Sequence, residues 1–515
     1  MRKFWVTILA LGLVAAFAMP AAAVDVKFTG QYYVQGWYVD NVSLLDKNEV
    51  STNKDSWKAN DQRGAAALYS QRFRLQTEFK VAEGLTLVTR FDALEKVWGS
   101  ANWRGGTGET QTRKQVPVDN NNDATTVPAA QENIEFERVY LDMNTAIGKF
   151  QIGYQQFLMW GTDFLNTPLT APGIRYLGQS GPLTWIAAIE KRRDFAGSYS
   201  GNNPTTTSNI GRANDGDHDV YDLGVIYKFK PGEVGLMYQY GRNAWNKPPT
   251  RTNPDGNGYY TTQVSIFLPY AKLNFGNFFI EGEGLYGTGK MYAYEPRQLS
   301  GGNPNQDVNC TQWGLFLHGK YTFKPAYFGL QFVYLSGDDM DADDKITGSL
   351  TQALSAGYGF DRTLILWNSA YGDTGFGARA TGATGAANPA PGGNSNPRTA
   401  LTHYPYYYMD NCWFYQGYVG VNPLPKMDVR LALSYAVADK KPREKVGAVS
   451  ATNKEFVSDK IGTELDLIAT YKIFDNLEYM LGAGYLWTGD YFKGFDTNNV
   501  VKDNYIITHK LTLNF

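Results

Sequence analysis

Apolar and polar residues alternate one by one through most of this chain. In LYSQRFRLQTEFKVAEGLTLVTRFDA (residues 68–93), Phe73, Leu75 and Phe79 project to one side of an extended strand. Arg72 and Arg74 project to the other side, because successive side chains of a strand point to opposite faces. This period of two predicts half-apolar β-strands and argues against a helical protein.

The connections between the expected strands are alternately short and long. Tight turns fall at residues 82–84, 146–148, 179–181, 230–232, 275–277, 324–325, 423–425 and 474–476. Long segments rich in Gly, Asn, Thr and Pro fall at residues 40–64, 99–131, 193–216, 242–258, 292–309, 338–404 and 440–457. Short periplasmic turns and long extracellular loops are typical of bacterial outer-membrane barrels. We therefore predict an all-β fold, a transmembrane antiparallel β-barrel of about 18 strands.

The last strand indicates how this barrel closes. In residues 504–515, Tyr505, Ile507, Leu511 and Phe515 share one face, which only His509 interrupts. A half-apolar strand with a free edge would pair with other chains. We expect it to pair with the first strand, VKFTGQYYVQGWYV (residues 26–39), while lipid covers its apolar face.

The first 23 residues have the features of a secretory signal peptide. Arg2 and Lys3 precede an apolar run at residues 4–18, and the alanines at 21–23 form a small-residue cleavage site. The apolar run is shorter than the roughly 20 residues that a membrane-spanning helix needs. We expect residues 1–23 to be removed and residues 24–515 to form the barrel in the bacterial outer membrane.

Composition agrees with an exported barrel and argues against nucleic-acid binding. The chain is 15% aromatic with 54 glycines. Its mean hydropathy of −0.38 does not reveal a membrane protein, because only alternate residues of a barrel strand face lipid. Loss of Arg2 and Lys3 changes the formal charge from −2 to −4, which leaves no basic excess. Cys310 and Cys412 permit either one disulfide or two free thiols.

The polar strand faces carry many charged residues. Burial of unpaired ionic groups costs several kcal/mol each, so we expect a water-filled interior. Cations and carboxylates on these faces are balanced in number, which favours a general diffusion pore over a polyanion channel. A structural alternative, in which charges pair across neighbouring strands, stays open for each residue. The predicted pore-lining residues are Arg72, Arg74, Glu78, Arg90, Asp92, Glu135, Glu137, Arg430, Glu464 and Asp466.

The alternation is irregular at two places, and tryptophans mark many strand ends. Residues 137–144 put Arg138 on the apolar face, and Pro269 interrupts residues 265–275, so we expect a β-bulge at each place. Tryptophans near strand ends are expected in the aromatic girdles at the membrane interfaces. These are Trp37, Trp98, Trp160, Trp185, Trp313, Trp413 and Trp487.

Three motifs resemble a known family, the alginate-export-like outer-membrane channels. IGTELDLIATYKIFDNLEYMLGAGYLWTGDYFKG (residues 461–494) resembles its closing strands, with a G-T-E-x-D-L strand and a hairpin that ends in G-Y-x-x-x-G-D. KFQIGYQQFLMWGTDF (residues 149–164) resembles an early strand, with Tyr154 in place of the usual arginine and Thr162 between Gly161 and Asp163. VYLSGDDMDADD (residues 333–344) is similar to its S-G-D turn before an acidic loop.

The resemblance implies a monomeric 18-stranded barrel surrounded by outer-membrane lipid and lipopolysaccharide. It also implies assembly by the outer-membrane insertion machinery, which would recognise the strand ending in Phe515. It implies no particular substrate, because the family takes its name from an exporter of a polyanionic polysaccharide while many members are described simply as porins.

One candidate metal site lies in the acidic stretch GDDMDADDK. Asp339, Asp341 and Asp343 have the i, i+2, i+4 spacing of oxygen ligands for calcium, without the central glycine and distal glutamate of a helix-loop-helix site. An extracellular structural calcium and a solvated acidic loop are the two alternatives. No other cofactor is expected. The chain is not expected to be an enzyme, because its four histidines are scattered and G-x-S-x-G and H-E-x-x-H motifs are absent.

These features predict an outer-membrane porin, a water-filled channel for passive diffusion of small hydrophilic solutes or ions. Residues 338–404 are the expected pore-constricting loop, because their apolar run RTLILW (residues 362–367) can contact the inner wall. One alternative is a selective channel or exporter for an anionic saccharide. The second alternative is a barrel that encloses a partner such as a cytochrome.

Overall fold

The computed structural model describes residues 25–41, 44, 65–98, 134–157, 159–165, 170–193, 217–244, 260–294, 307–338, 345–348, 360–368, 409–442, 455–494, 497–498 and 500–515. The elements are β1 (Asp25–Asp40), β2 (Ala65–Ala82), β3 (Leu85–Val97), β4 (Ile134–Thr145), β5 (Gly148–Gln156), β6 (Thr170–Ser180), β7 (Leu183–Arg193), β8 (His218–Phe229), β9 (Gly232–Asn243), β10 (Tyr260–Phe275), β11 (Phe278–Tyr294), β12 (Val308–Phe323), β13 (Ala326–Leu335), β14 (Lys345–Ile346), β15 (Cys412–Leu424), β16 (Met427–Ala438), β17 (Lys460–Phe474), β18 (Leu477–Thr488), the 3-10 helix η4 (Asp490–Lys493) and β19 (Asn504–Asn514).

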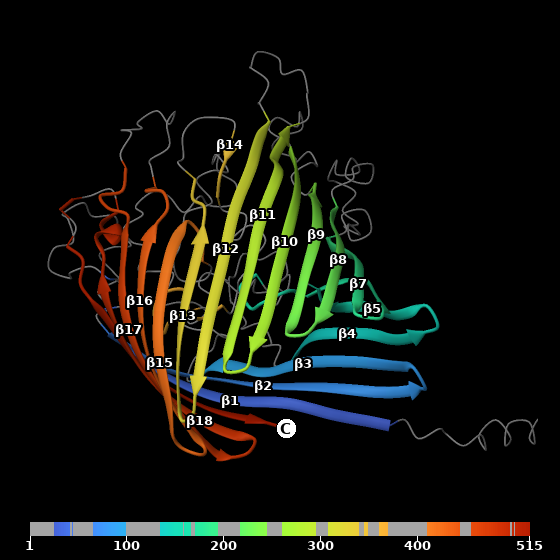
Figure 1. The fold of residues 1–515 in the computed structure, drawn as a ribbon, viewed down its shortest axis with the longest axis horizontal. Coiled ribbons are helices and arrows are strands. Elements are labelled where there is room, and N and C mark those ends of the chain that lie inside the picture. The colour runs from blue at the N-terminus through green and yellow to red at the C-terminus, as the bar shows by residue number, and fades with distance from the viewer. Residues whose placement is uncertain are drawn as a thin grey trace, which may run out of the picture.

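Eighteen of these strands close into an antiparallel barrel, as the sequence predicted (Figure 1). β1 pairs with β2 on one side and with β19 on the other, from Gln31 opposite Asn514 to Asp40 opposite Tyr505. The two-residue β14 instead runs parallel to the start of β12. Ring closure thus removes the free edge of the last strand.

Two-residue turns join pairs of consecutive strands at one end of the barrel, and the longer connections lie at the other end. The turns are residues 83–84, 146–147, 181–182, 230–231, 276–277, 324–325, 425–426 and 475–476. They confirm the short turns that the sequence predicted. The long connection after β5 was missed, because residues 149–164 were interpreted as one strand whereas β5 ends at Gln156.

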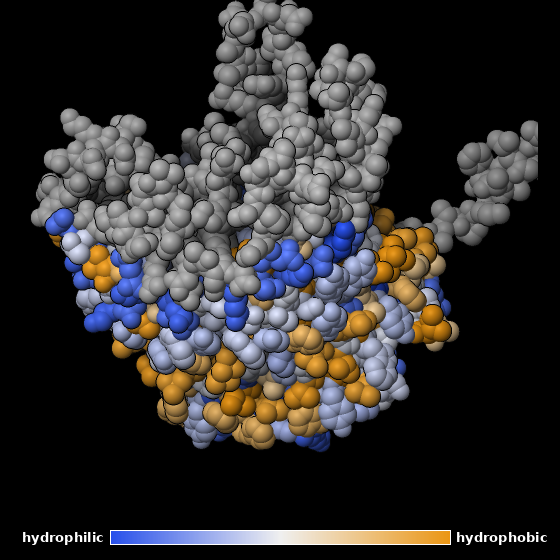
Figure 2. Space-filling view, turned by 90° about the horizontal axis from the view of Figure 1, so that it is seen from above, coloured by the Kyte–Doolittle hydropathy of each residue, from blue (hydrophilic) through white to orange (hydrophobic). Residues whose placement is uncertain are grey.

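The outer surface of the barrel is apolar. Leu433 and Leu481, for example, point outward with 53% and 50% of their surface exposed. Figure 2 shows hydrophobic residues across the lower part of one face and strongly hydrophilic residues along its upper edge. Lipid requires that the backbone N–H and C=O groups pair within the protein and that the outer surface is apolar. The closed ring of paired strands meets the first requirement, and its outward side chains meet the second. The protein is therefore a transmembrane β-barrel.

The tryptophans divide between the outside and the inside of the wall. Four of them are exposed on the outside, in agreement with the predicted girdles, and these are Trp98, Trp185, Trp313 and Trp487. Trp37 and Trp160 are buried, so the girdle prediction is wrong for both. The Trp160 indole N–H donates a hydrogen bond of 2.8 Å to the carbonyl oxygen of Leu268 inside the barrel.

The bulge predicted at Arg138 is confirmed. Arg90 lies opposite Arg138, whereas Phe91 lies opposite Phe136, so Glu137 is the extra residue of β4. Because of this extra residue, Glu137 and Arg138 both bond to polar side chains of the interior. The bulge therefore adds a charge to the inner wall without turning the rest of β4 around.

No bulge occurs at Pro269, contrary to the prediction. Pro269 lies opposite Leu236, and the register of β10 with β9 continues unchanged on both sides of it. Its side chain is exposed on the outer face. Because proline lacks an N–H group, the ladder with β11 passes over residues 268–269 without an added residue.

The barrel interior is only partly polar. A large buried apolar cluster fills one side of it, and its members include Leu268, Phe316, Phe414 and Ile506. Cys310 and Cys412 belong to this cluster as free thiols rather than as a disulfide. Two connections fold inward and pack against the wall on this side, which leaves the rest of the interior for the expected water. Among the described residues, no helix combines the length and the apolar character that a membrane crossing requires.

Candidate functional site

Two connections between strands fold into the barrel. Residues 157 and 159–165 follow β5, and residues 360–368 precede β15. We call them the first and the second inner segment. Phe164, Ile365 and Trp367 are among their side chains, and each is buried with 2% exposure or less. The second inner segment contains the apolar run that the sequence analysis placed in a constricting loop.

The second inner segment is bound to the wall through Glu464 of β17. This carboxylate accepts hydrogen bonds from three successive backbone N–H groups, those of residues 364–366, at 3.0, 2.7 and 2.9 Å. The Gln416 amide of β15 donates a further bond of 2.8 Å to the carbonyl oxygen of Arg362. A buried carboxylate is costly unless donors surround it, and this segment supplies the donors.

Glu464 and Asp466 therefore do not line open water, contrary to the prediction for the pore lining. The alternation of β17 does place both side chains on the inner face. The second inner segment covers them, and only 0% and 1% of their surface remains exposed. The sequence could not show this, because Leu364 of the covering segment lies 100 positions before Glu464 in the chain.

The first inner segment is bound to β10 and β11. Glu283 accepts hydrogen bonds from the Thr162 N–H at 2.9 Å and from its hydroxyl at 2.6 Å. The Trp160 ring meets Tyr270 edge to face, with 5.1 Å between ring centroids. Gly161 has a φ of 58°, and a Cβ at this position would lie 2.7 Å from Glu283 Oε1. Only glycine permits this close approach to the carboxylate.

The two inner segments contact each other. Arg362 of the second forms an ion pair with Asp163 of the first at 3.6 Å. The Phe360 ring lies 4.0 Å below the Arg362 guanidinium and 5.3 Å from the Phe164 ring. Phe316 of β12 packs against both phenylalanines. Burial lowers the pKa of Arg362, while the neighbouring Asp163 favours its charged form. The segments thus form one unit that spans the wall from β10 to β17.

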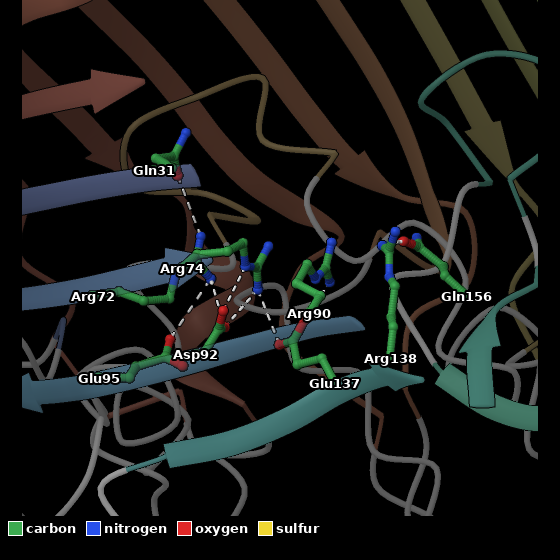
Figure 3. Close-up of polar contacts among 9 residues, drawn as sticks. All are labelled: Gln31, Arg72, Arg74, Arg90, Asp92, Glu95, Glu137, Arg138 and Gln156. Atoms are coloured by element: carbon green, nitrogen blue, oxygen red, sulfur yellow. Dashed lines mark hydrogen bonds and ion pairs between the residues drawn. The ribbon is translucent and has the colours of Figure 1, made fainter. Parts of the chain in front are cut away.

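On the other side of the barrel, β2, β3 and β4 carry a cluster of charged side chains (Figure 3). Arg74 forms a bidentate ion pair with Asp92, with two N···O distances of 2.6 Å, and lies 2.9 Å from Glu137. Arg90 pairs with Glu137, and Arg72 lies 3.8 Å from Asp92. Apart from Asp92, these side chains keep 13–24% of their surface exposed to solvent inside the barrel. We call this group the arginine cluster.

Three further arginines face the interior with no carboxylate at ion-pair distance among the residues that the structure describes. Arg138 donates to the amide oxygen of Gln156, and Arg175 donates to backbone carbonyl groups at the end of β5 and just beyond it. Arg430 lies over the ring of Tyr418, 5.1 Å from its centroid. These three arginines thus carry positive charge that no described carboxylate in direct contact neutralises, while several carboxylates of the inner wall are buried beneath the inner segments.

The predicted pore-lining residues fall into three groups. The arginine cluster contains Arg72, Arg74, Arg90, Asp92 and Glu137. Three residues lie apart from each other. Glu78 lies near the end of β2, Glu135 lies opposite Asp92, and Arg430 lies over the ring of Tyr418. The last two, Glu464 and Asp466, lie beneath the second inner segment.

Sequence reasoning did not single out Arg138 or Thr162 as functional residues. The predicted bulge was the available signal for Arg138, because an extra residue turns this side chain inward. No sequence pattern marks the contact of Thr162 with Glu283, since the two residues are 121 positions apart.

The predicted calcium ligands Asp339, Asp341 and Asp343 lie outside the described residues. The same holds for most of residues 338–404, of which the structure describes 338, 345–348 and 360–368. Within the described ranges, no group of three or more His, Cys, Asp or Glu side chains is arranged to hold a metal ion.

Comparison with known proteins gives distant structural likenesses. No family model matches the chain, and no curated protein matches it. OccAB4 of Acinetobacter baumannii is similar at 12% identity and a TM-score of 0.44, over 96% of this chain and 99% of the other. The outer membrane protein opdK of Pseudomonas aeruginosa is similar at 11% identity and a TM-score of 0.42, over 95% of this chain and 99% of the other. A BenF-like porin from Pseudomonas fluorescens Pf-5 is similar at 11% identity and a TM-score of 0.43, over 95% of this chain and 99% of the other. At such distances, none of these likenesses carries a family or a function over to this chain.

Proposed function

We propose that the protein is a porin of the bacterial outer membrane, a water-filled channel for passive diffusion of small hydrophilic solutes. One observation carries the proposal. Arg72, Arg74, Arg90 and Glu137 keep 13–24% of their side-chain surface exposed inside a barrel whose outer surface is apolar. Charged groups at membrane depth face either a bundle interior or a water-filled cavity, and exposed ones require water.

The path of the solute is proposed to run along β2–β4 rather than through the centre of the barrel. On the other side, the inner-wall residues Phe316, Phe414 and Ile506 are 0% exposed, because the inner segments and their neighbours cover them. The arginine cluster keeps its contact with solvent. The second inner segment, which belongs to the predicted loop 338–404, would therefore set the width of the path.

Liposome swelling tests this proposal. Purified protein is reconstituted, and the swelling rate is measured with neutral sugars of increasing size, for the wild type and for a variant in which a Gly-Ser linker replaces residues 361–367. We expect swelling with small sugars, and faster swelling that extends to larger sugars in the variant. A correctly assembled wild-type barrel that admits no sugar would contradict the channel, and an unchanged size limit in the variant would contradict the constricting role.

A second candidate function is an anion-selective channel, including one for an acidic saccharide. The observation that favours it is a set of interior arginines that have no carboxylate partner in the described part of the chain, Arg138, Arg175 and Arg430. A narrow pore with low-dielectric walls concentrates the field of such charges. The motif resemblance to alginate-export-like channels is a further, weaker support for an acidic saccharide.

Reversal potentials under a KCl gradient test the second candidate. We expect anion preference in the wild type and its loss in the triple variant Arg138→Gln, Arg175→Gln, Arg430→Gln. Lys426→Gln is the matched control, because Lys426 lies at a turn outside the membrane span and its partner is the exposed Asp475. An equal preference in all three proteins would exclude these arginines as the selectivity element.

The surroundings of the barrel are part of the proposal. We propose a monomer in lipid and lipopolysaccharide, assembled by the outer-membrane insertion machinery, with no resident cofactor and no catalytic role. Light scattering of the detergent-solubilised protein measures the oligomeric state. The alternative barrel that encloses a partner, such as a cytochrome, predicts that the purified protein alone conducts no ions.

A further inference from the structure

We propose that Glu283 and Glu464 are positioning residues that hold the two inner segments as one coupled unit and thereby set the size limit of the channel. This inference rests on the proposed channel function and adds the side chains that hold its constriction in place. Each of these carboxylates is buried, belongs to a different strand, and accepts hydrogen bonds from an inner segment.

The second inner segment is built as a receptor for a carboxylate. Trp367 has a φ of 50°, and Asn368 Nδ2 donates to the Thr363 carbonyl oxygen at 3.1 Å, which closes residues 363–368 into a compact turn. The N–H groups of residues 364–366 consequently converge on the two oxygens of Glu464. Successive N–H groups in such a turn form an anion-binding nest. A glutamine would present one acceptor oxygen and two donor hydrogens to these three donors.

The first inner segment is held by similar chemistry. Glu283 Oε2 accepts from both the N–H and the hydroxyl of Thr162, and the Thr162 hydroxyl oxygen accepts from the Phe164 N–H at 3.1 Å. One carboxylate oxygen thereby fixes the backbone just before Phe164, whose ring contacts the other segment. Loss of this oxygen would leave the buried N–H and hydroxyl of Thr162 without an acceptor.

The contact between the segments couples the two anchors. Arg362 and Asp163 pair across it. The rings of Phe164 and Phe360 meet edge to face, and both contact the same β12 residue, Phe316. The anchoring strands β11 and β17 are separated by β12, β13, β15 and β16 in the ring. Release of either anchor therefore loosens a unit whose other end is still held by the second anchor.

The test compares Glu464→Gln, Glu283→Gln and the double variant in the full-length reconstituted protein. Loss of a buried hydrogen-bonded contact changes the fraction of released segment about tenfold or more. We expect each single variant to raise the swelling rate with sugars that the wild type excludes, and the double variant to exceed the larger single effect only slightly. If the increase in swelling rate of the double variant equals the product of the two single increases, the segments are not coupled and the inference is overturned.

Asp222→Asn is the matched control for burial of an inner-wall carboxyl group. Asp222 of β8 is buried like the anchors, but its hydrogen bond runs to Gln239 of β9 instead of an inner segment. We expect the size limit of the Asp222→Asn channel to equal that of the wild type. A control that admits the same larger sugars as Glu464→Gln would overturn the positioning role, because general loosening of the barrel would then explain both.

Trypsin cleavage after Arg362 gives a readout that does not depend on conduction. Only 21% of the Arg362 side chain is exposed in the docked segment, and we expect cleavage to accelerate about tenfold or more when Glu464 is replaced. Ile365→Pro removes the middle N–H donor while the wall stays unchanged, so it should act like Glu464→Gln. If the wild-type barrel admits no solute but cleavage accelerates, the channel proposal fails and the anchoring stands. If cleavage and size limit stay unchanged in both variants, the anchoring fails.

A designed disulfide provides the rescue. A Cβ built on Gly484 of β18 would lie 3.2 Å from Cβ of Leu364, close to the separation found in disulfides. It would also lie 2.7 Å from Asp466 Oδ1, so the Asp466 side chain must shift to admit the cross-link. Leu364→Cys with Gly484→Cys, in a chain without Cys310 and Cys412, should restore the wild-type size limit to Glu464→Gln on oxidation and release it on reduction. A cross-linked variant that still admits the larger sugars would overturn the inference.

Discussion

Individual carboxylates inside this barrel serve two different purposes. Asp92 and Glu137 neutralise neighbouring arginines next to solvent, whereas Glu283 and Glu464 accept hydrogen bonds from peptide groups that would otherwise be unsatisfied. An apolar side chain in place of either anchor would leave those N–H groups without acceptors. The distinction follows from what covers each residue, since all four lie on inner strand faces.

Arg74 is predicted to contribute more to stability than its neighbour Arg138. Arg74→Met leaves the buried Asp92 without its bidentate partner, and we expect a loss of about 3–5 kcal/mol in the free energy of unfolding. Arg138→Met removes a hydrogen bond to a neutral amide and should cost about 1 kcal/mol. Urea unfolding in lipid vesicles, followed by tryptophan fluorescence, measures both. Equal losses would show that the bidentate pair is not the source of the difference.

Leu433 is predicted to be sensitive to charge because it faces lipid near the middle of β16. Leu433→Arg should lower the unfolding free energy by about 2–4 kcal/mol, since the charge must reach water from the membrane centre. Leu424→Arg is the control, because Leu424 is equally exposed but lies beside a turn, where the expected loss is about 0–1 kcal/mol. The same unfolding assay measures both variants. Comparable losses of unfolding free energy would show that Leu433 does not lie deeper in the membrane than Leu424.

At the level of whole strands, register decides which side of the wall each residue faces. The extra residue Glu137 lets β4 present two successive polar side chains inward while Val139 and Leu141 remain exposed outside. A strand without such a bulge has no means to absorb an added residue, because a shift by one position exchanges the two faces.

Deletion of Glu137 is predicted to leave the barrel assembled, because a one-to-one ladder replaces the bulge and the outward residues keep their side. Insertion of one alanine after Leu467 of β17 should prevent assembly, because it turns Thr470 and Lys472 toward lipid while Tyr471 and Ile473 turn inward. Heat-modifiable migration on gels reports the assembled fraction. Assembly of the insertion variant would contradict the register, and failure of the deletion variant would contradict the bulge.

The strands and turns could be predicted from the sequence, and the inner segments could not. Period-two alternation marks each strand locally, so the sequence predicted the fold class, the turns and the bulge at Arg138. The first inner segment follows β5 without a change in composition, and its role depends on Gly161 and Thr162 meeting Glu283 from another strand. Contacts across more than a hundred residues leave no local period to detect.

Two features describe the molecule as a whole: the strands close into a ring, and the interior of this ring is filled on one side only. The ladder between the first and last strands turns an open sheet into a ring. The inner segments then fill one side of this ring, while Arg74 and Glu137 of the arginine cluster stay partly exposed on the other. The sequence indicated closure through the pattern of residues 504–515, but the asymmetry arises only after distant segments have come together.

Closure predicts a specific cross-link. Val34 lies opposite Leu511, so Val34→Cys with Leu511→Cys should form a disulfide between β1 and β19 in a chain without Cys310 and Cys412. Ile507 lies opposite Tyr38, so Val34→Cys with Ile507→Cys should not cross-link. Migration of the denatured, non-reduced protein on gels separates the circularised chain from the linear one. Cross-linking of the second pair alone would show that the register of the closing strands is different.

The most direct test of the channel is the current through single molecules of purified protein in a planar bilayer under a KCl gradient. We expect discrete conductance steps, with a reversal potential that shows anion preference if the interior arginines determine selectivity. A bilayer that stays silent although the inserted barrel is shown to be folded would contradict an open path beside the arginine cluster.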